Sequence, residues 1–322
     1  MTKVLVTGAG GFIGSYLVKY LKSLGYCVFG VDLKYPEFDE TAADQFYLID
    51  LRNFRNCMLA LHSGFDEVYN LAANMGGIGF IETHKSEIVH DNSLISLYML
   101  EAAYKSNVKK FFYTSSACVY PRYKQNTIDL EKSTLKEEDA YPADPEDGYG
   151  WEKLYTERMC RHYTEDCGMQ TRVVRFHNIF GPLGTYDGGR EKSPAAICRK
   201  IALAEQEDTI EVWGDGEQRR SYCYIDDCVK GIHLLMKSDW QDPINLGTDR
   251  MISINQLVDI VSRISGKVIK KEYDLTKPVG VRGRNSDNTR LKNTLNWEPS
   301  ISLEAGLTKT YNWIYEQVHK KK

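Results

Sequence analysis

The sequence lacks the features that would indicate a membrane, secreted or nucleic-acid-binding protein. Among its 322 residues no apolar run approaches the roughly 20 residues that a membrane-spanning helix needs. The N-terminus passes from Met1-Thr2-Lys3 into a strand pattern and has no signal-peptide pattern. A net charge of −3 offers no excess of positive charge to attract nucleic acid. We therefore expect a soluble protein with neither a membrane nor a nucleic-acid partner.

The cysteines lack the spacings that indicate a metal site or a disulfide framework. Eight are present, but no C-x-x-C pair occurs among them. Scattered cysteines without a signal peptide are typical of reduced thiols in the cytoplasm. We therefore predict a cytoplasmic location and no bound metal. Internal repeats and low-complexity segments are also absent, and the length suits one large domain with a smaller lobe.

A glycine-rich loop joins the first predicted strand (3–7) to a segment with apolar residues at helical spacing (12–24). A second strand (27–31) follows and ends at Asp32. The loop reads G-x-x-G-x-x-G, which lets a backbone approach a pyrophosphate at a helix N-terminus. Asp32 would accept hydrogen bonds from the adenosine ribose and repel a 2′-phosphate, so we predict NAD as the cofactor. The predicted cofactor-binding residues of the loop are Gly8, Gly11, Phe12, Ile13 and Gly14.

Strands continue to alternate with helices up to residue 176. Predicted strands cover 45–50, 65–73 and 108–116, and a long helix covers 87–106. This alternation predicts the α/β class, with a Rossmann-like doubly wound parallel sheet whose ligands bind at the carboxyl ends of the strands. Further residues at such ends are expected to contact the dinucleotide: Asp50, Leu51, Ala72 and Ala73.

Beyond residue 176 the pattern becomes irregular and rich in glycine. We predict an NAD-binding domain from residues 1–176 plus roughly 223–250, and a smaller substrate-binding lobe from 177–222 and 251–322. Helix 87–106 carries apolar residues on several sides, which fits burial within one chain or against a partner subunit equally well. A homodimer through this helix and residues 149–167 is our expectation.

Two side chains suited to activate an alcohol stand four residues apart. Tyr149 and Lys153 share one face if "YGWEK" (149–153) is helical. A lysine ammonium, together with the positive nicotinamide ring of NAD⁺, would lower the pKa of the phenol from its usual value of about 10. The tyrosine could then act as a base. Because Ser116 ends strand 108–116 and offers a hydroxyl to the same substrate oxygen, the three side chains predict oxidation of an alcohol.

These motifs resemble the extended short-chain dehydrogenase/reductases that act on nucleotide sugars. Longer strings narrow the resemblance to the GDP-mannose 3,5-epimerases: "NLAANMGGIGF" (70–80), "SSACVYP" (115–121), "RFHNIFGPLGTYDGGREKSPAA" (175–196), "WGDGEQRRSY" (213–222) and "GVRGRNSDN" (280–288). The resemblance covers essentially the whole chain. It implies a GDP-sugar substrate, NAD as a catalytic cofactor and conversion of GDP-mannose to GDP-L-galactose or GDP-L-gulose.

The same resemblance implies roles for a cysteine and a lysine. Enzymes of this kind oxidise the sugar at C4, exchange protons at C3 and C5 and then return the hydride. Epimerisation needs one group on each face of the sugar, and the matching positions here are Cys118 and Lys192. The implied substrate-binding residues are Gly76, Ser116, Ala117, Cys118, Asn178, Glu191, Lys192, Lys200, Gln218, Arg220 and Arg282.

Several alternatives stay open at this point. Cys118 could be a buried strand-end residue, and Lys192 could be a solvated loop lysine. Another GDP-sugar, such as a GDP-heptose, would differ only at C6 and hence in pocket size. A non-catalytic NAD-sensing protein of the same fold would not need all the candidate catalytic residues. A 4,6-dehydratase would be expected to carry an acidic pair where this chain has Ala117-Cys118.

Overall fold

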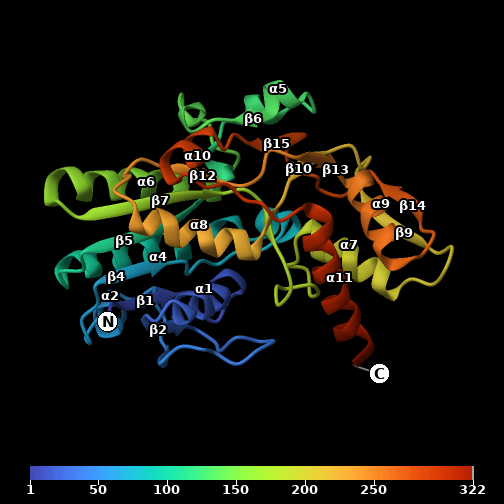
Figure 1. Cartoon of the computed structure of the whole chain (residues 1–322). Coiled ribbons are helices and arrows are strands. Elements are labelled where there is room, and N and C mark those ends of the chain that lie inside the picture. Colours follow the sequence, from blue (N-terminus) through green and yellow to red (C-terminus); the bar gives the residue numbers. More distant parts are fainter. Residues whose placement is uncertain (321–322) are drawn as a thin grey trace.

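The computed structural model describes residues 1–320, and its main feature is a seven-stranded parallel sheet (Figure 1). The strand order is β12-β7-β5-β4-β1-β2-β3. Its strands are β1 (Lys3–Thr7), β2 (Cys27–Asp32), β3 (Gln45–Leu48), β4 (Glu67–Asn70), β5 (Lys110–Ser116), β7 (Gln170–Phe176) and β12 (Ile244–Leu246). All neighbouring strands pair in parallel. The doubly wound α/β sheet predicted from the sequence is therefore confirmed.

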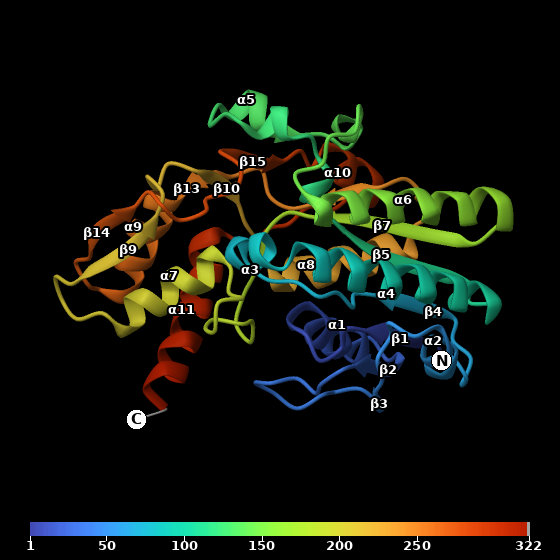
Figure 2. The same cartoon turned by 180° about the vertical axis from the view of Figure 1, so that it is seen from behind.

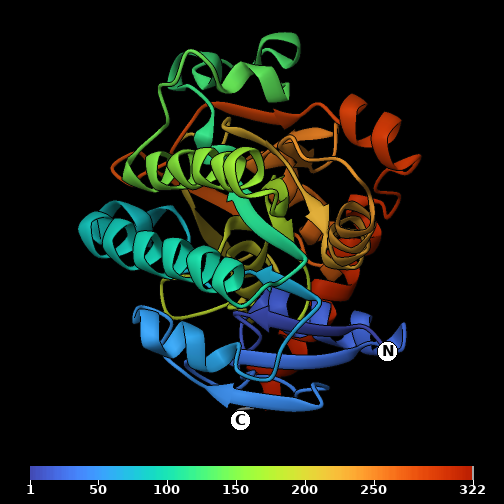
Figure 3. The same cartoon turned by 90° about the vertical axis from the view of Figure 1, so that its left-hand side faces the viewer.

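Helices cover both faces of this sheet, which Figure 3 shows edge-on. On one face lie α1 (Phe12–Ser23) and α8 (Ile225–Lys237), and on the other α2 (Phe54–Ala60), α4 (Lys85–Lys105) and α6 (Gly148–Cys167) (Figure 2). Successive residues of a strand point to opposite faces. Val4 and Val6 accordingly pack with the core beneath α1 and α8, whereas Leu5 packs with the core beneath α2, α4 and α6.

A smaller lobe lies beside the carboxyl ends of the strands of the large sheet (Figure 1). Its helices are α7 (Ser193–Leu203), α9 (Ile254–Ser265) and α11 (Leu303–Lys320), which pack on one another. Strands β9 (Thr209–Trp213) and β14 (Lys270–Asp274) form a parallel pair. A four-stranded sheet has the order β13 (Met251–Ser253), β10 (Arg219–Ser221), β15 (Gly283–Ser286), β6 (Thr134–Leu135).

Short elements complete the connections. These are α3 (Ile78–Thr83), η1 (Ala117–Val119), η2 (Arg122–Gln125), α5 (Leu130–Ser133), η3 (Glu137–Ala140), β8 (Ile179–Phe180), β11 (Cys223–Tyr224) and α10 (Thr289–Leu295). Strand β6 lies within the predicted NAD-binding domain but pairs with β15 of the other lobe. The exact division into two domains stays a prediction. Within residues 1–320 no helix is both long enough and apolar enough to cross a membrane.

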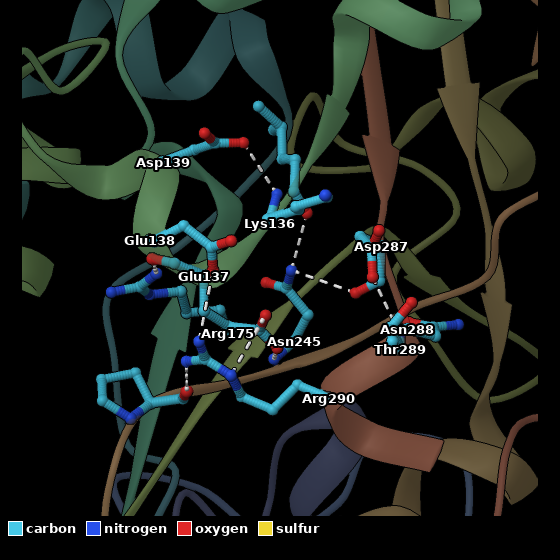
Figure 4. A network of polar contacts seen from close by, with 12 residues as sticks. Lys136, Glu137, Glu138, Asp139, Arg175, Asn245, Asp287, Asn288, Thr289 and Arg290 are labelled. Atoms are coloured by element: carbon cyan, nitrogen blue, oxygen red, sulfur yellow. Dashed lines mark hydrogen bonds and ion pairs between the residues drawn. The ribbon is translucent and has the colours of Figure 1, made fainter. Parts of the chain in front are cut away.

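A buried polar network fastens the large sheet to the small lobe (Figure 4). Its centre is Asn245 on β12, whose side-chain oxygen accepts a hydrogen bond from the Tyr120 hydroxyl at 2.6 Å. The Asn245 amide donates to the carbonyl of Leu135 at 2.9 Å and to that of Asp287 at 3.4 Å. The backbone amide of Asn245 donates to the Glu137 carboxylate at 2.9 Å. Buried polar groups must be paired to be stable, so this network fixes β6 and β15 relative to β12.

Candidate active site

The glycine loop lies between β1 and α1, as the sequence predicted. A Cβ at Gly14 would stand 2.0 Å from the carbonyl oxygen of Gly8, so only glycine lets the helix begin this close to the loop. The N-cap of α1 is Gly11, which makes no side-chain hydrogen bond to the first turn. The backbone amides of Phe12 and Ile13 therefore open an uncapped helix N-terminus, which favours an anionic group such as a pyrophosphate.

Asp32 connects the end of β2 to this loop. Its carboxylate accepts hydrogen bonds from the backbone amides of Gly10 at 2.9 Å and Leu33 at 2.6 Å. Burial raises the pKa of Asp32, and the hydrogen bonds from those amides oppose the shift. A partly exposed carboxylate beside an uncapped helix start suits the ribose hydroxyls of NAD and disfavours the 2′-phosphate of NADP. The residues of this edge therefore fit NAD.

The other predicted cofactor residues follow β3 and β4. Leu51 is buried, whereas Asp50 forms an ion pair with Arg52 at 2.8 Å. The backbone amide of Ala72 donates to the Thr7 hydroxyl at 3.0 Å, which holds the segment of Ala72 and Ala73 against the end of β1. Contact of these residues with the dinucleotide stays a prediction.

Ser116, Tyr149 and Lys153 come from one strand end and one helix. Ser116 ends β5, and the other two lie in the first two turns of α6. Asp147 caps α6, because its carboxylate accepts hydrogen bonds from the amides of Tyr149 at 2.9 Å and Gly150 at 3.2 Å. Both candidate side chains are buried, and the Lys153 ammonium lies 5.6 Å from the centre of the Tyr149 ring. The helix start thus positions the phenol and the ammonium together.

The pKa of Tyr149 departs from the sequence-based expectation. Burial raises the pKa of this phenol well above its ordinary value, and the nearby charges of Cys118 and Glu152 raise it further. A hydrogen bond with Ser116 acts in the opposite direction. Desolvation therefore outweighs the attractions that favour the phenolate. The lowered pKa of Tyr149 that the sequence predicted is therefore not found in this structure.

Cys118 follows Ser116 in the short helix η1, and its backbone amide donates to the Ser116 hydroxyl at 3.1 Å. Arg284 of β15 approaches the thiol from the small lobe, with its Nη1 atom 3.5 Å from Sγ. The same guanidinium donates to Gln125 at 2.6 Å and to Glu146 at 2.5 Å. Cys118 therefore lies at the junction of the two lobes and is not an isolated packing residue.

Opposing charges act on the Cys118 thiol. Burial raises the pKa of the thiol, and the neighbouring carboxylates of Glu146 and Asp147 act in the same direction. The Arg284 guanidinium and the Ser116 hydrogen bond lower it, but they do not overcome burial. The net direction favours a protonated thiol near neutral pH.

Lys192 reaches the same region from the loop before α7. This loop is held in place by the amide of Gly77, which donates to the carbonyl of Arg190 at 3.0 Å. A Cβ at Gly77 would lie 2.4 Å from the carbonyl oxygen of Glu191, so the two loops touch along their backbones. The Lys192 side chain is exposed. The protein around it nevertheless removes part of the water from its ammonium, which lowers the pKa, while the charge of Cys118 acts to raise it. Lys192 and Cys118 are thus electrostatic neighbours.

Several predicted substrate residues border this region. Burial, together with the charge of Arg284, lowers the pKa of Arg220 to about 10, and Cys118 acts to raise it. Asn178 has a left-handed backbone (φ 44°) and donates to the carbonyl of Ser221 at 2.9 Å. The side-chain oxygen of Gln218 is buried without a hydrogen-bond partner, which leaves an acceptor available. Ala117 is buried in η1, and Gly76 packs against Phe80.

Three other predicted substrate residues are engaged elsewhere. Glu191 pairs with Arg199 at 3.1 Å, Lys200 with Glu211 at 3.1 Å, and Arg282 with Asp215 at 3.0 Å. Within residues 1–320 none of the three has a hydrogen bond or ion pair with Cys118, Tyr149 or Lys192. Their contact with substrate stays a prediction.

Sequence reasoning missed Arg284, Glu146 and Gln125. Arg284 stands in the "GVRGRNSDN" string, two residues after Arg282, but its proximity to Cys118 depends on the pairing of β10 with β15. Glu146 immediately precedes the N-cap of α6, where an acid is ordinarily explained by the helix dipole. No local pattern would have joined these residues to a thiol.

An uncapped glycine loop, a strand-end carboxylate and a Ser-Tyr-Lys set with a buried tyrosine and lysine together define a nicotinamide-dependent enzyme of the Rossmann type. The sequence profile of the NAD dependent epimerase/dehydratase family matches residues 4–247. The chain belongs to this family and is an NAD-dependent isomerase.

Particular relatives narrow the assignment. GDP-mannose 3,5-epimerase 1 from Oryza sativa subsp. japonica is 48% identical to this chain over 99% of its length and 83% of the relative. GDP-mannose 3,5-epimerase from Arabidopsis thaliana is also 48% identical, over 99% of this chain and 84% of the relative. The UDP-glucose 4-epimerase of Thermotoga maritima, solved with UDP-glucose, has a TM-score of 0.89 at 28% identity and covers 98% of this chain and 100% of its own. This chain therefore has the fold of nucleotide-sugar epimerases.

Proposed function

We propose that the protein epimerises GDP-mannose at C3 and C5, towards GDP-L-galactose and GDP-L-gulose. The observation that carries the proposal is the position of Cys118, two residues from Ser116 and 3.5 Å from Arg284. A simple 4-epimerase needs the Ser-Tyr-Lys set but no thiol beside it. Similarity to GDP-mannose 3,5-epimerases supports the same substrate.

The oxidation at C4 rests on residues of the large sheet. NAD, when bound, supplies a hydride acceptor for C4 of the sugar and returns the hydride at the end of the cycle. The Tyr149 oxygen takes the proton of the C4 hydroxyl, and Ser116 donates a hydrogen bond to the same oxygen. The Lys153 side chain lies 5.6 Å from the centre of the Tyr149 ring, where an ammonium favours the phenolate that must be present before this proton is taken. Burial of Tyr149 and Lys153 limits the access of competing water to these two side chains.

Proton exchange rests on residues of both lobes. A C4 ketone acidifies the C–H bonds at C3 and C5, so one side chain removes a proton and another delivers one to the opposite face. Cys118 and Lys192 fill these roles: the raised pKa of Cys118 keeps a proton on the thiol for delivery, and the lowered pKa of Lys192 makes its ammonium easier to deprotonate. The tyrosine then returns its proton to the C4 oxygen.

Product analysis tests the substrate. Purified protein would be incubated with GDP-mannose, and separately with a GDP-heptose, and the nucleotide sugars separated by anion-exchange chromatography. We expect new GDP-hexose peaks from GDP-mannose that depend on Tyr149. Turnover of the GDP-heptose alone would show that the substrate is a GDP-heptose and would leave the proposed mechanism unchanged. No turnover of either nucleotide sugar would favour a non-catalytic NAD-binding role.

We also propose a homodimer and a cytoplasmic location. Trp151 and Tyr155 on α6 are each about half exposed, and they extend along the outer face of a helix that packs on α4. Large exposed aromatic side chains of this kind are common at subunit interfaces. Light scattering should give twice the mass of one chain, and a monomer mass would contradict the dimer. All eight cysteines are free, which supports a reducing compartment and is checked by cell fractionation.

A further inference from the structure

The partly buried carboxylate of Glu146 lies beside the candidate acid–base thiol and has no role in the reaction above. Its side chain is 16% exposed and forms a 2.5 Å ion pair with Arg284, whose side chain is 9% exposed. The backbone amide of Glu146 also donates to the carbonyl of Cys118 at 3.3 Å. Glu146 therefore touches both the cysteine backbone and the cation that contacts the cysteine sulfur.

The negative charge of Glu146 offsets the positive charge that Arg284 places beside the Cys118 thiol. An arginine alone at 3.5 Å would stabilise a thiolate. A carboxylate that shares the arginine cancels most of that effect and adds its own repulsion of a thiolate. The pKa of Cys118 responds to both groups in these directions: Glu146 raises it and Arg284 lowers it. Burial acts to raise the pKa of Glu146, but the charge and hydrogen bond of Arg284 outweigh it and hold the pKa below its ordinary value, so Glu146 stays ionised.

We propose that Glu146 is a positioning residue for Cys118: it anchors Arg284 beside the sulfur and offsets its charge, so that the cysteine keeps its proton until the reaction takes it. The proposal rests on the proposed function of Cys118 in proton exchange. It adds a residue that sets whether this group begins as a thiol or a thiolate.

Other groups also act on the thiol and must be held constant. Those on the packed elements are Ser116, Asp147, Tyr149, Lys192, Arg220 and Arg284. Substituting Glu146→Gln changes none of them and keeps an oxygen that can accept a hydrogen bond from Arg284. Gln125 still accepts from the same guanidinium at 2.6 Å, so the cation stays in place.

The test measures the alkylation rate of Cys118 by iodoacetamide against pH, in protein loaded with NAD, with the modified peptide followed by mass spectrometry. Glu146→Gln should lower the thiol pKa, and a shift of one unit raises the rate at pH 7 roughly tenfold. Glu146→Asp should restore the wild-type profile. Asp144→Asn is the matched control, because it removes an exposed carboxylate from the same segment and should change nothing.

Each outcome decides the proposal. An unchanged or slower alkylation in folded Glu146→Gln would overturn it. If that variant fails to fold, Arg284→Gln takes its place, and its alkylation must slow because the stabilising cation is gone; an unchanged rate would again overturn the proposal. The alkylation needs no turnover, so a failure of GDP-mannose epimerisation is a separate result. In active protein, proton exchange should shift to lower pH in Glu146→Gln, whereas a merely structural defect would reduce it equally at every pH.

Discussion

The two halves of the candidate site are built differently. Ser116, Tyr149 and Lys153 come from one strand end and one helix of the large sheet. Cys118, Lys192 and Arg284 come from three segments, and two of those lie in the small lobe. Local structure therefore fixes the proposed hydride-transfer half of the site (Ser116, Tyr149 and Lys153). The proposed proton-exchange half (Cys118, Lys192 and Arg284) forms only where the two lobes meet. A variant of the proton-exchange residues should therefore stop exchange and leave hydride transfer, whereas a variant of the hydride-transfer residues should stop both.

The largest effect is expected from Tyr149→Phe. Loss of the proton acceptor at C4 should stop both halves, because proton exchange at C3 and C5 requires the C4 ketone. General acid–base groups contribute about 10²–10⁴-fold, so turnover of GDP-mannose should fall by about a thousandfold. The measurement is the initial rate of product formation. Tyr155→Phe on the exposed side of the same helix serves as the control and should keep the wild-type rate.

Cys118→Ala should separate the two halves. Proton exchange should fall by at least about a hundredfold, because one face of the sugar loses its acid–base group. Hydride transfer should survive, since Ser116 and Tyr149 are untouched, and substrate should still produce the absorbance of reduced nicotinamide. Cys167→Ala, at an exposed cysteine, is the control. Normal epimerisation by Cys118→Ala would show that the cysteine has no role in exchange.

A smaller loss is expected when only the position of Lys192 changes. In Gly77→Ala the new Cβ would meet the carbonyl of Glu191 at 2.4 Å and displace the loop that carries the lysine. A misplacement of about 1 Å can cost up to about a hundredfold, and we expect a loss of about tenfold in exchange with unchanged affinity for NAD. Gly188→Ala is the matched control in the same loop, because its Cβ would meet nothing within 4 Å, although its backbone has a positive φ. Equal losses in the two variants would argue against the positioning role.

The smallest effect concerns stability and not turnover, and it is expected at the contact between the two lobes. His177 is fully buried against Asn245, and desolvation lowers its pKa from 6.5 to about 3. The unfolded chain then binds a proton below pH 6.5 that the folded chain does not, so stability falls as the pH falls from about 6.5 towards 3. The difference between pH 7 and pH 5 amounts to about 2 kcal/mol of unfolding free energy. Urea unfolding should show this loss in the wild type, and His177→Gln should lack that part of the pH dependence.

The sequence could predict the part of the site whose residues are close together in the chain. Strand, glycine loop, helix and Asp32 are local in the chain, and the structure places them as predicted. Tyr149 and Lys153 share a helix, so their spacing alone brings them together. The hydride-transfer half was therefore readable from short patterns.

The proton-exchange half depends on distant contacts. Arg284 reaches Cys118 across 166 residues, and the amide of Gly77 holds a loop more than a hundred residues away. The direction of the Tyr149 pKa also escaped prediction, because it depends on how completely the phenol is buried. Long strings of residues indicated Cys118 and Lys192 through resemblance, but neither spacing nor composition gave their geometry.

The most direct test of the account is proton NMR of the purified protein with GDP-mannose and NAD⁺ in D₂O. We predict loss of the signals at C3 and C5, together with new GDP-hexose resonances, and retention of the hydrogen at C4 because the hydride returns to the same carbon. Deuterium at C3 and C5 should be absent when Cys118→Ala replaces the wild type. Epimerisation without exchange at these carbons, or no exchange in NAD-loaded protein, would contradict the assignment of Cys118 and Lys192 as opposed acid–base groups.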